Sequence, residues 1–332
     1  MQGLHTDEYL ESVYAGRKVS PRYFLQRFLE RAGKILKASG YSVVFLQKEL
    51  LPYVPPIFEL SVRLGGMKVV YDIDDAIFLF YTNTRNPIVR LFLGNKIPQV
   101  LRWSHLVLAG NTYLERYAAR YNRRTIYFPT VIDPSRYSSA WLNAPGKDAT
   151  GEGPVIGWIG TPETAPFLLQ KVAVLNRVSQ RTPFKLLVIG SPHLSIPGLD
   201  VETVPWSEER ETSELARCDI GIMPLPSTVW AKGKCGLKLL QYMASELPVV
   251  SSPEGGARDI IKHGVTGYIA HSDDDWQHYL SILLNDLSLR RCLGQEGRRC
   301  IEEKFALSLW APRMAELLRK VGQGEDPGEV NW

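Results

Sequence analysis

Three lysines and two glycines stand directly before an apolar stretch in the second half of the chain, in the order KGKCGLK. The helix that this stretch predicts would present unpaired backbone N–H groups and a partial positive charge to phosphate oxygens. Glycine lets a ligand approach the backbone closely, and lysine offsets its charge. The loop consists of Lys232, Gly233, Lys234, Gly236 and Lys238. It predicts a site for an anionic ligand, and a glycine turn with solvated lysines is the alternative interpretation.

A second cluster is acidic and lies in the first half. Asp72, Asp74 and Asp75 follow the apolar run MKVVY, and strand alternation places Asp72 and Asp74 on the same face. Three interpretations stay open. Asp74 or Asp75 binds or deprotonates an acceptor hydroxyl, the cluster holds a hard metal ion such as magnesium, or it is a strand-end turn with an N-capping aspartate.

The elements around the lysine loop predict an open parallel sheet. Apolar runs of strand length alternate with helical stretches from Pro154 onward, and the first of these helices is expected near residues 163–179. The helix that begins near Lys234 ends before Pro248, and LPVVS suits a buried strand. Such alternation is typical of a doubly wound α/β domain, whose ligands lie beyond the carboxyl ends of the strands. Glycines follow several of these strands: Gly160, Gly190, Gly255 and Gly256.

The first half predicts a second, less complete α/β domain. Strands are expected at residues 42–47, 67–72, 105–109 and 125–128, and helices near 21–37, 56–63, 87–102 and 112–120. The first residues offer no opening strand and glycine turn, so we expect this domain to lack its opening β-α unit. Residues 138–153 are rich in Ala, Asn, Gly and Asp and show no periodicity, so we expect this segment to contain the linker. The expected division is a domain at 1–145, a linker at 146–153, a second domain at 154–322 and a flexible tail at 323–332.

Composition narrows the class of protein. The chain has 332 residues, of which 45% are hydrophobic and 22% charged, which suits two packed domains and excludes a disordered chain. A net charge of +4 permits anionic ligands, and no nucleic-acid-binding motif accompanies it. Four cysteines without metal-ligand spacing predict reduced thiols in a cytoplasmic chain.

The helix predicted from Pro21 to Lys37 is basic and amphipathic. Its apolar face includes Phe24 and Leu25, and arginines and lysines surround that face. Such a helix can lie on anionic lipid, which would give peripheral membrane contact at the inner membrane surface. The alternative is a helix that packs on its own sheet with solvated basic residues.

Four motifs of the second half can be compared with known families: GWIGTPET, DIGIMPLP, KGKCGLKLLQYMASELPVV and GGARDIIKHGVTGYI. Together they resemble the donor-binding domain of GT-B glycosyltransferases of the family-four or group-one type, over about Pro154 to Leu318. The resemblance implies two Rossmann-like domains facing a cleft, with a nucleotide-diphosphate sugar held by the second and an acceptor by the first. It also implies a retaining, metal-independent transferase with no cofactor besides its nucleotide-sugar co-substrate.

Some positions depart from the family pattern. The usual glutamate pair falls on Gly233 and Gln241, and the basic residue after the first glycine loop falls on Thr161. Gln241 can still hydrogen-bond ribose or sugar hydroxyls. Charge stabilisation of the diphosphate is therefore assigned to the lysines and the helix N-terminus. The expected donor-binding residues are Gly160, Thr161, Lys232, Gly233, Lys234, Gly236, Lys238 and Gln241, and the expected catalytic residues are Asp74 and Asp75, with no metal site.

The partners implied are a nucleotide-sugar donor and a glycan, lipid-linked or small-molecule acceptor. Trp158 and Trp206 lie near predicted strand ends, where they either border the nucleotide base or pack in the core. Two other functions stay open besides the transferase. One is an epimerase or hydrolase of nucleotide sugars on the same fold, and the other is a non-catalytic nucleotide-sugar-binding protein, which the missing glutamates would suit.

Overall fold

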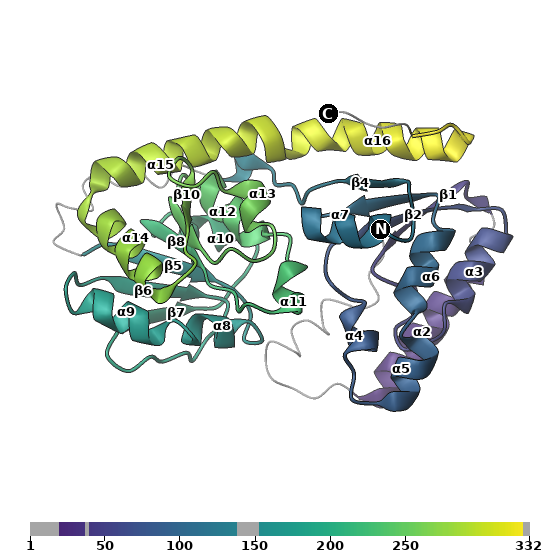
Figure 1. Ribbon diagram of the computed structural model, residues 1–332, viewed down its shortest axis with the longest axis horizontal. Coiled ribbons are helices and arrows are strands. Elements are labelled where there is room, and N and C mark those ends of the chain that lie inside the picture. Colours follow the sequence, from purple (N-terminus) through teal and green to yellow (C-terminus); the bar gives the residue numbers. More distant parts are fainter. Residues whose placement is uncertain (1–19, 37–39, 138–152, 328–332) are drawn as a thin grey trace. The chain divides into compact units, whose positions relative to one another are not determined.

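The computed structural model describes residues 20–36, 40–137 and 153–327 of the chain. The chain divides into two compact units (Figure 1). Unit 1 comprises Met1–Pro129 together with Arg313–Trp332, and unit 2 comprises Thr130–Pro312. Each unit contains its own parallel sheet, so each is an α/β layer structure in its own right.

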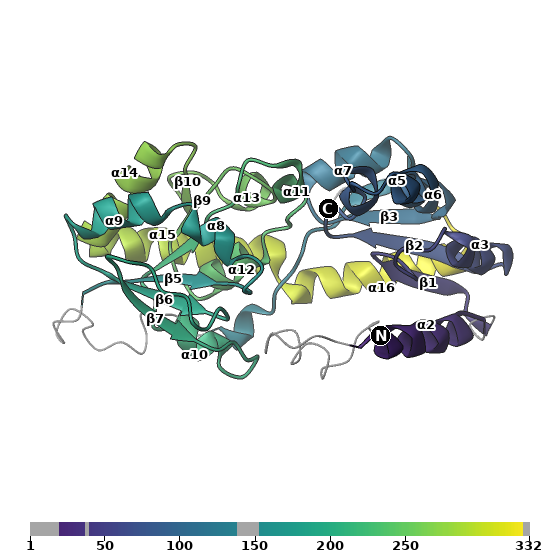
Figure 2. The same cartoon turned by 90° about the horizontal axis from the view of Figure 1, so that it is seen from below.

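Unit 1 has a four-stranded parallel sheet in the order β1-β2-β3-β4. Its strands are β1 (Val43–Gln47), β2 (Lys68–Ile73), β3 (Leu106–Ala109) and β4 (Thr125–Tyr127). Its helices are α2 (Pro21–Leu36), α3 (Ile57–Leu64), α4 (Leu79–Thr82), α5 (Pro87–Leu93), α6 (Lys96–Trp103), α7 (Thr112–Ala119) and the C-terminal part of α16 (Leu307–Gln323). Figure 2 shows α5, α6 and α7 on one side of this sheet and α2 on the other. β3 is buried throughout, as expected for a strand covered on both faces.

Unit 2 has a six-stranded parallel sheet in the order β10-β9-β8-β5-β6-β7. The strands are β5 (Val155–Ile159), β6 (Lys185–Ile189), β7 (Asp200–Val204), β8 (Ile220–Met223), β9 (Val249–Ser251) and β10 (Gly267–Ile269). The helices include α8 (Ala165–Leu169), α9 (Val172–Ser179), α10 (Glu211–Leu215), α11 (Val229–Lys232), α12 (Leu237–Ala244), α13 (Ala257–Ile260), α14 (Asp273–Asn285) and α15 (Leu287–Cys300), and the π-helix Ile301–Phe305 follows. The strand order reverses between β5 and β8. In open α/β sheets, ligands bind at such a switch point.

The strands expected from the sequence are present in both units, but two expected helices are each split in two. Residues 87–102 form α5 and α6, separated at Gly94 and Asn95. Residues 163–179 form α8 and α9, separated at Gln170 and Lys171. Glycine and asparagine are poor interior helix residues, which explains the first break. The short helix α4 had no counterpart among the expected elements.

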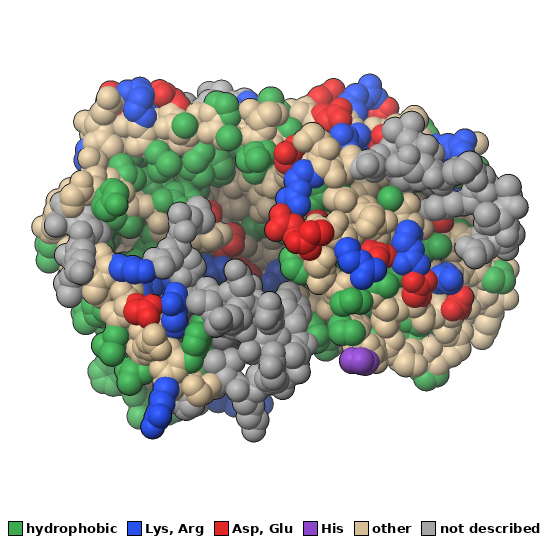
Figure 3. Space-filling model, turned by 180° about the vertical axis from the view of Figure 1, so that it is seen from behind, with side chains coloured by type: hydrophobic (Ala, Val, Ile, Leu, Met, Phe, Trp, Pro, Cys, Tyr) green, Lys and Arg blue, Asp and Glu red, His purple; other side chains and the backbone are tan. Residues whose placement is uncertain are grey.

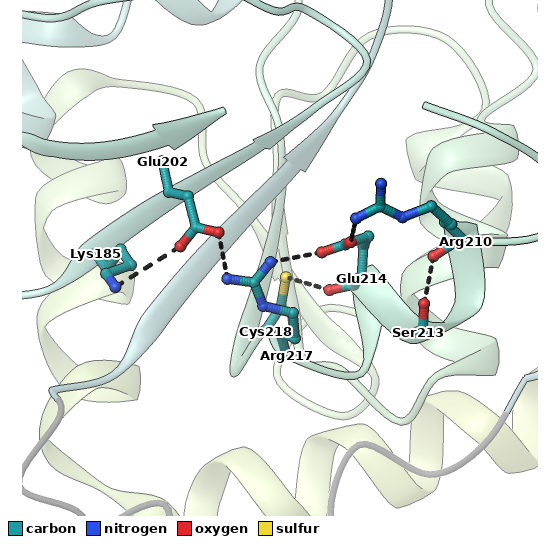
Figure 4. Close-up of polar contacts among 7 residues, drawn as sticks. All are labelled: Lys185, Glu202, Arg210, Ser213, Glu214, Arg217 and Cys218. Atoms are coloured by element: carbon teal, nitrogen blue, oxygen red, sulfur yellow. Dashed lines mark hydrogen bonds and ion pairs between the residues drawn. The ribbon is translucent and has the colours of Figure 1, made fainter. Parts of the chain in front are cut away.

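Ion pairs attach α10 to the edge strand β7 (Figure 4). The guanidinium of Arg217 pairs with Glu202 of β7 and, at 2.6 Å, with Glu214 of α10. These two partners raise the pKa of Arg217 above its ordinary value. Lys185 of β6 lies 3.7 Å from the same Glu202 carboxylate. Helix α10 begins with Glu211, so these ion pairs also fix the position of that residue.

The observed division of the chain differs from the expected one. Ile132 donates its N–H to the carbonyl of Phe305 at 3.0 Å and forms a parallel bridge with Ala306, so this stretch belongs to unit 2. The Lys68 ammonium donates to the carbonyl of Gly322 at 3.4 Å, which attaches the C-terminal segment to unit 1. These contacts join residues far apart in sequence, and composition alone does not reveal them. The expected linker lies outside the described residues except for Gly153.

Candidate functional site

Gly160 and Lys238 come together at the switch point of the unit 2 sheet. Gly160 directly follows β5, and Lys238 lies in the first turn of α12. A Cβ atom at Gly160 would lie 2.6 Å from the Lys238 ammonium nitrogen and 2.5 Å from the ring of Trp158, so only glycine fits. The same nitrogen lies 4.5 Å from the centre of the Trp158 ring, within the range of a cation–π contact. A cation is therefore held over the first glycine turn.

The helix that carries Lys238 begins at Leu237, somewhat later than expected. Gly236 precedes it in the left-handed region with φ of +82°, and a Cβ there would lie 2.7 Å from the Cδ1 atom of Ile260. A side chain at this position would be strained and obstructed. No side chain caps α12. The N–H groups of its first turn thus have the character of an anion site.

The backbone of the lysine loop is hydrogen-bonded to a second glycine turn, formed by Gly255 and Gly256. Gly256 donates its N–H to the carbonyl of Lys234 at 2.7 Å. Gly255 has φ of +65°, and a Cβ there would lie 3.0 Å from the carbonyl oxygen of Ala231. The glycines that follow β9 therefore set the backbone of the lysine loop. The Lys234 ammonium lies 4.8 Å from the centre of the Trp230 ring, and Lys232 is exposed at the end of α11.

The Lys238 ammonium has an unusual electrostatic environment. Burial, and secondarily the positive charge of Lys234, lower the pKa of Lys238 to about 7. Without a bound anion, the Lys238 side chain is therefore only partly protonated near neutral pH. A lysine at the end of a parallel sheet with such a pKa is a typical feature of a functional site.

Gln241 points into a buried network. It is 7% exposed, and its side chain is hydrogen-bonded to Tyr137. The Tyr137 hydroxyl donates to Glu211 at 2.6 Å, and the Trp206 indole N–H donates to the other oxygen of the same carboxylate at 2.7 Å. The role of Gln241 in binding a ribose or sugar hydroxyl stays a prediction, because the described contacts of this side chain are within the protein.

Trp206 lies on the rim of the same sheet. It follows β7, and its Cβ lies 3.1 Å from where a Cβ of Gly190 would be. Its side chain is 43% exposed, whereas Trp158 is 1% exposed and packs in the core. Tyr137 and Glu211 were not among the expected site residues, because neither belongs to a motif and their contacts depend on the fold. Thr161 forms a local turn in which its N–H donates to the Thr164 hydroxyl at 3.1 Å.

The acidic cluster lies at the carboxyl end of β2 in unit 1. Burial, and then the negative charge of Asp74, raise the pKa of Asp72 to about 7. Burial also raises the pKa of Asp74, and the charge of Lys48 opposes this rise. Gln47 donates to the Asp74 carboxylate at 3.0 Å. The carboxylate of Asp75 accepts the N–H of Ala76 at 2.9 Å, in a tight turn.

Buried polar contacts position the loop that carries Lys48. Lys48 itself has φ of +64°, which is unusual for a residue with a side chain. The ammonium of Lys96, nearly fully buried, lies 2.6 Å from the Glu49 carboxylate and donates to the carbonyl of Leu51 at 2.5 Å. The Tyr81 hydroxyl donates to the same Glu49 at 2.6 Å. The backbone of this loop is therefore held beside the acidic edge, where Lys48 acts electrostatically on Asp72 and Asp74. Lys48 and Gln47 were not among the expected site residues.

No group of three or more His, Cys, Asp or Glu residues in the described part of the chain is arranged to hold a metal ion. No described helix is long and apolar enough to cross a membrane.

Part of the chain is similar in sequence to known proteins. Residues 153–286 match the family described as Glycosyl transferases group 1. A segment of 69 residues is 35% identical to the capsular polysaccharide biosynthesis glycosyltransferase CapM of Staphylococcus aureus. A segment of 76 residues is 34% identical to the N-acetyl-alpha-D-glucosaminyl L-malate synthase of Bacillus anthracis. These segments are 20% and 22% of this chain and span only 18% and 20% of the two relatives.

Solved structures match nearly the whole chain. Sucrose-phosphate synthase from Thermosynechococcus elongatus has a TM-score of 0.69 at 15% identity, covering 93% of this chain and 82% of that chain. HepE of Anabaena, in complex with UDP and glucose, has a TM-score of 0.67 at 14% identity, covering 87% of this chain and 81% of that chain.

The fold and the matched segment define the class of protein. The chain has the GT-B fold of glycosyltransferases, with two Rossmann-like parallel-sheet units. Residues 153–286, which match the group 1 glycosyltransferase family, lie in the second of these units. The resemblance inferred from the sequence motifs is therefore confirmed, and so is the expected α/β fold class.

Proposed function

We propose that the protein is a glycosyltransferase that moves a sugar from a nucleotide-diphosphate sugar to an acceptor hydroxyl. The observation that carries the proposal is the Lys238 ammonium, which lies over the Gly160 turn beside the N-terminus of α12. A half-neutralised lysine at a helix N-terminus suits a diphosphate, because the ligand supplies the missing negative charge. In the transition state the same groups would stabilise charge on the departing diphosphate.

The remaining donor contacts are assigned to residues near the carboxyl ends of the strands of the unit 2 sheet. In this proposal Thr161, Lys232, Gly233 and Lys234 also contact the phosphates, and Lys232 is exposed. The exposed indole of Trp206 borders the nucleotide base, and Glu211 holds its N–H. HepE was solved with UDP and glucose, so uridine diphosphate sugars are the first donors to test. The acceptor hydroxyl is assigned to Asp74 and Asp75, with Asp72 and Lys48 tuning the charge of that edge.

A thermal-shift panel of nucleoside diphosphates and their sugars tests donor binding. A ligand at 100 times its Kd should raise the free energy of unfolding by about 2.7 kcal/mol. The absence of a shift with every nucleotide would contradict the proposed function. Turnover then separates the alternatives. A hydrolase or epimerase would form product from the donor alone, and a non-catalytic protein would bind the donor without turnover.

Transfer should be independent of metal and should retain the anomeric configuration. Lysines and the helix N-terminus neutralise the diphosphate in this proposal, so activity should change less than about twofold in excess EDTA. The measurement is product formation with and without chelator, with the anomer assigned by NMR. Loss of activity that manganese restores would instead favour a metal-bound diphosphate.

Nucleotide affinity should fall as the pH rises above neutrality. Burial lowers the pKa of Lys238 to about 7 in the free protein, and a bound diphosphate should raise it, so binding takes up a proton. The favourable contribution is full below this free-state pKa. It is lost as the pH rises, by up to about tenfold in Kd per pH unit until the bound-state pKa is reached.

Calorimetry with UDP above about pH 7 measures this effect, because the terminal phosphate is already ionised there. Lys238→Met is the control, since it should bind more weakly but with little dependence on pH. A parental Kd that stays constant up to about pH 9 would show that Lys238 does not carry this titration.

A further inference from the structure

Helix α5 of unit 1 presents a continuous apolar face to solvent. Ile88, Leu91 and Phe92 are 66%, 78% and 71% exposed. Their spacing of three and four residues places them on one side of the helix. On the opposite side, Leu93 is buried. Single exposed leucines are common on protein surfaces, but three large side chains on one short helix face mark an interaction surface.

The structure determines this helix locally. Asn86 caps it by accepting the N–H groups of Ile88 and Val89 at 3.0 and 3.3 Å, and Pro87 occupies the first turn. Helix α4 packs beside α5 and adds Phe80, which is 48% exposed. The apolar face is therefore held in a defined conformation.

The charged residues of the segment that carries α4 and α5 are all basic. Arg85 and Arg90 are exposed, and the sequence has no aspartate or glutamate between Asp75 and Glu115. An apolar helix face bordered by arginines and without acidic residues is complementary to an anionic lipid surface, where side chains enter the acyl boundary and guanidinium groups meet phosphates. The helix has seven residues, so it can lie on a bilayer but cannot cross one.

Helix α2, for which the sequence predicts membrane contact, also combines exposed apolar side chains with basic residues. Its apolar side chains are less exposed than those of α5. Phe24 is 45% exposed, and Leu25 and Leu29 are each 61% exposed. Its acidic residue Glu30 is paired with Arg27 at 2.7 Å. Figure 3 shows hydrophobic and basic side chains intermingled over α2 at the lower left. Because α2 and α5 lie on opposite sides of the unit 1 sheet, they are separate surfaces (Figure 2).

We propose that the α5 face, formed by Phe80, Ile88, Leu91 and Phe92 with Arg85 and Arg90, docks the protein on anionic lipid bilayers. This inference goes beyond the proposed transfer reaction and does not depend on it. A membrane-bound transferase of this kind would have its acceptor-side unit at the lipid surface, which suits a lipid-linked acceptor.

Vesicle co-sedimentation of the full chain tests the proposal. Vesicles of phosphatidylglycerol and phosphatidylcholine in equal parts should bind the protein, and pure phosphatidylcholine vesicles should bind it much more weakly. The triple substitution Ile88→Ser, Leu91→Ser and Phe92→Ser should weaken binding about 100-fold. Arg85→Gln with Arg90→Gln should weaken binding to the anionic vesicles about 30-fold.

The matched control is Leu64→Ser, because Leu64 is 77% exposed at the end of α3 in the same unit. It should bind vesicles like the parent. Unchanged melting temperature and UDP affinity would show that the α5 variants are folded. Parental vesicle binding by the triple variant would overturn the proposal. Failure of the parent protein to bind the anionic vesicles would also overturn it. A parent dimer that the same substitutions dissociate would then assign the α5 face to self-association.

Discussion

Replacing Lys238 with methionine should weaken the binding of a nucleoside diphosphate by about 10- to 100-fold. Hydrogen bonds to charged groups contribute about 1.5 to 3 kcal/mol, and this lysine is the cation that lies over the Gly160 turn. Methionine keeps an unbranched stem against Trp158, so the change removes charge with little loss of packing. Isothermal titration calorimetry with UDP gives the two Kd values directly.

Lys185→Met provides the matched control. It removes the same charge from the same sheet, but at the amino end of β6, where Lys185 pairs with Glu202. We expect its Kd for UDP to change less than about twofold, because Lys185 lies at the opposite end of the strands from the Gly160 turn. The fold should also persist, since exposed ion pairs contribute little to stability. Equal affinity of the parent and Lys238→Met would remove Lys238 from the site and leave the helix N-terminus as the phosphate-binding element.

Much of the fold could be predicted because its signals are local. The apolar runs around Val155, Leu186 and Val249 are long enough and uninterrupted enough to indicate buried parallel strands. Glycines after those strands indicated the ligand edge. The break of residues 87–102 at Gly94 was missed because the apolar spacing continues across it, and glycine is not always a helix end.

The candidate site was predictable in part for the same reason. Lys238 was identified from its place near a helix start, but its contact with the Gly160 turn and Trp158 arises only when β5 and β8 become neighbours. The inward orientation of Gln241 depends on Tyr137, which is distant in sequence and belongs to no motif. Lys48 was missed because its influence on the acidic edge comes from parallel pairing of β1 with β2.

The acidic edge of unit 1 should control turnover and not donor binding. Asp74→Asn and Asp75→Asn should each lower kcat and kcat/KM together by at least about 100-fold, the lower end of general acid–base contributions. A carboxylate used only in the transition state leaves ground-state binding of the donor unchanged. Asparagine keeps an oxygen that can accept the Ala76 N–H and the Gln47 amide, so the local turn should persist.

The pH dependence of turnover distinguishes catalysis from a structural role. Burial and Asp74 raise the pKa of Asp72 to about 7, so a reaction that needs the charged edge should accelerate as the pH rises through that value. Asp72→Asn should remove this rise of the turnover rate with pH. Its Kd for UDP should stay parental, because Asp72 belongs to unit 1 and Lys238 to unit 2. Steady-state kinetics over that pH range, with calorimetry of each variant, provide the measurement. If Asp74→Asn and Asp75→Asn keep parental turnover, the cluster is a strand-end turn, and the acceptor base must be another residue of unit 1.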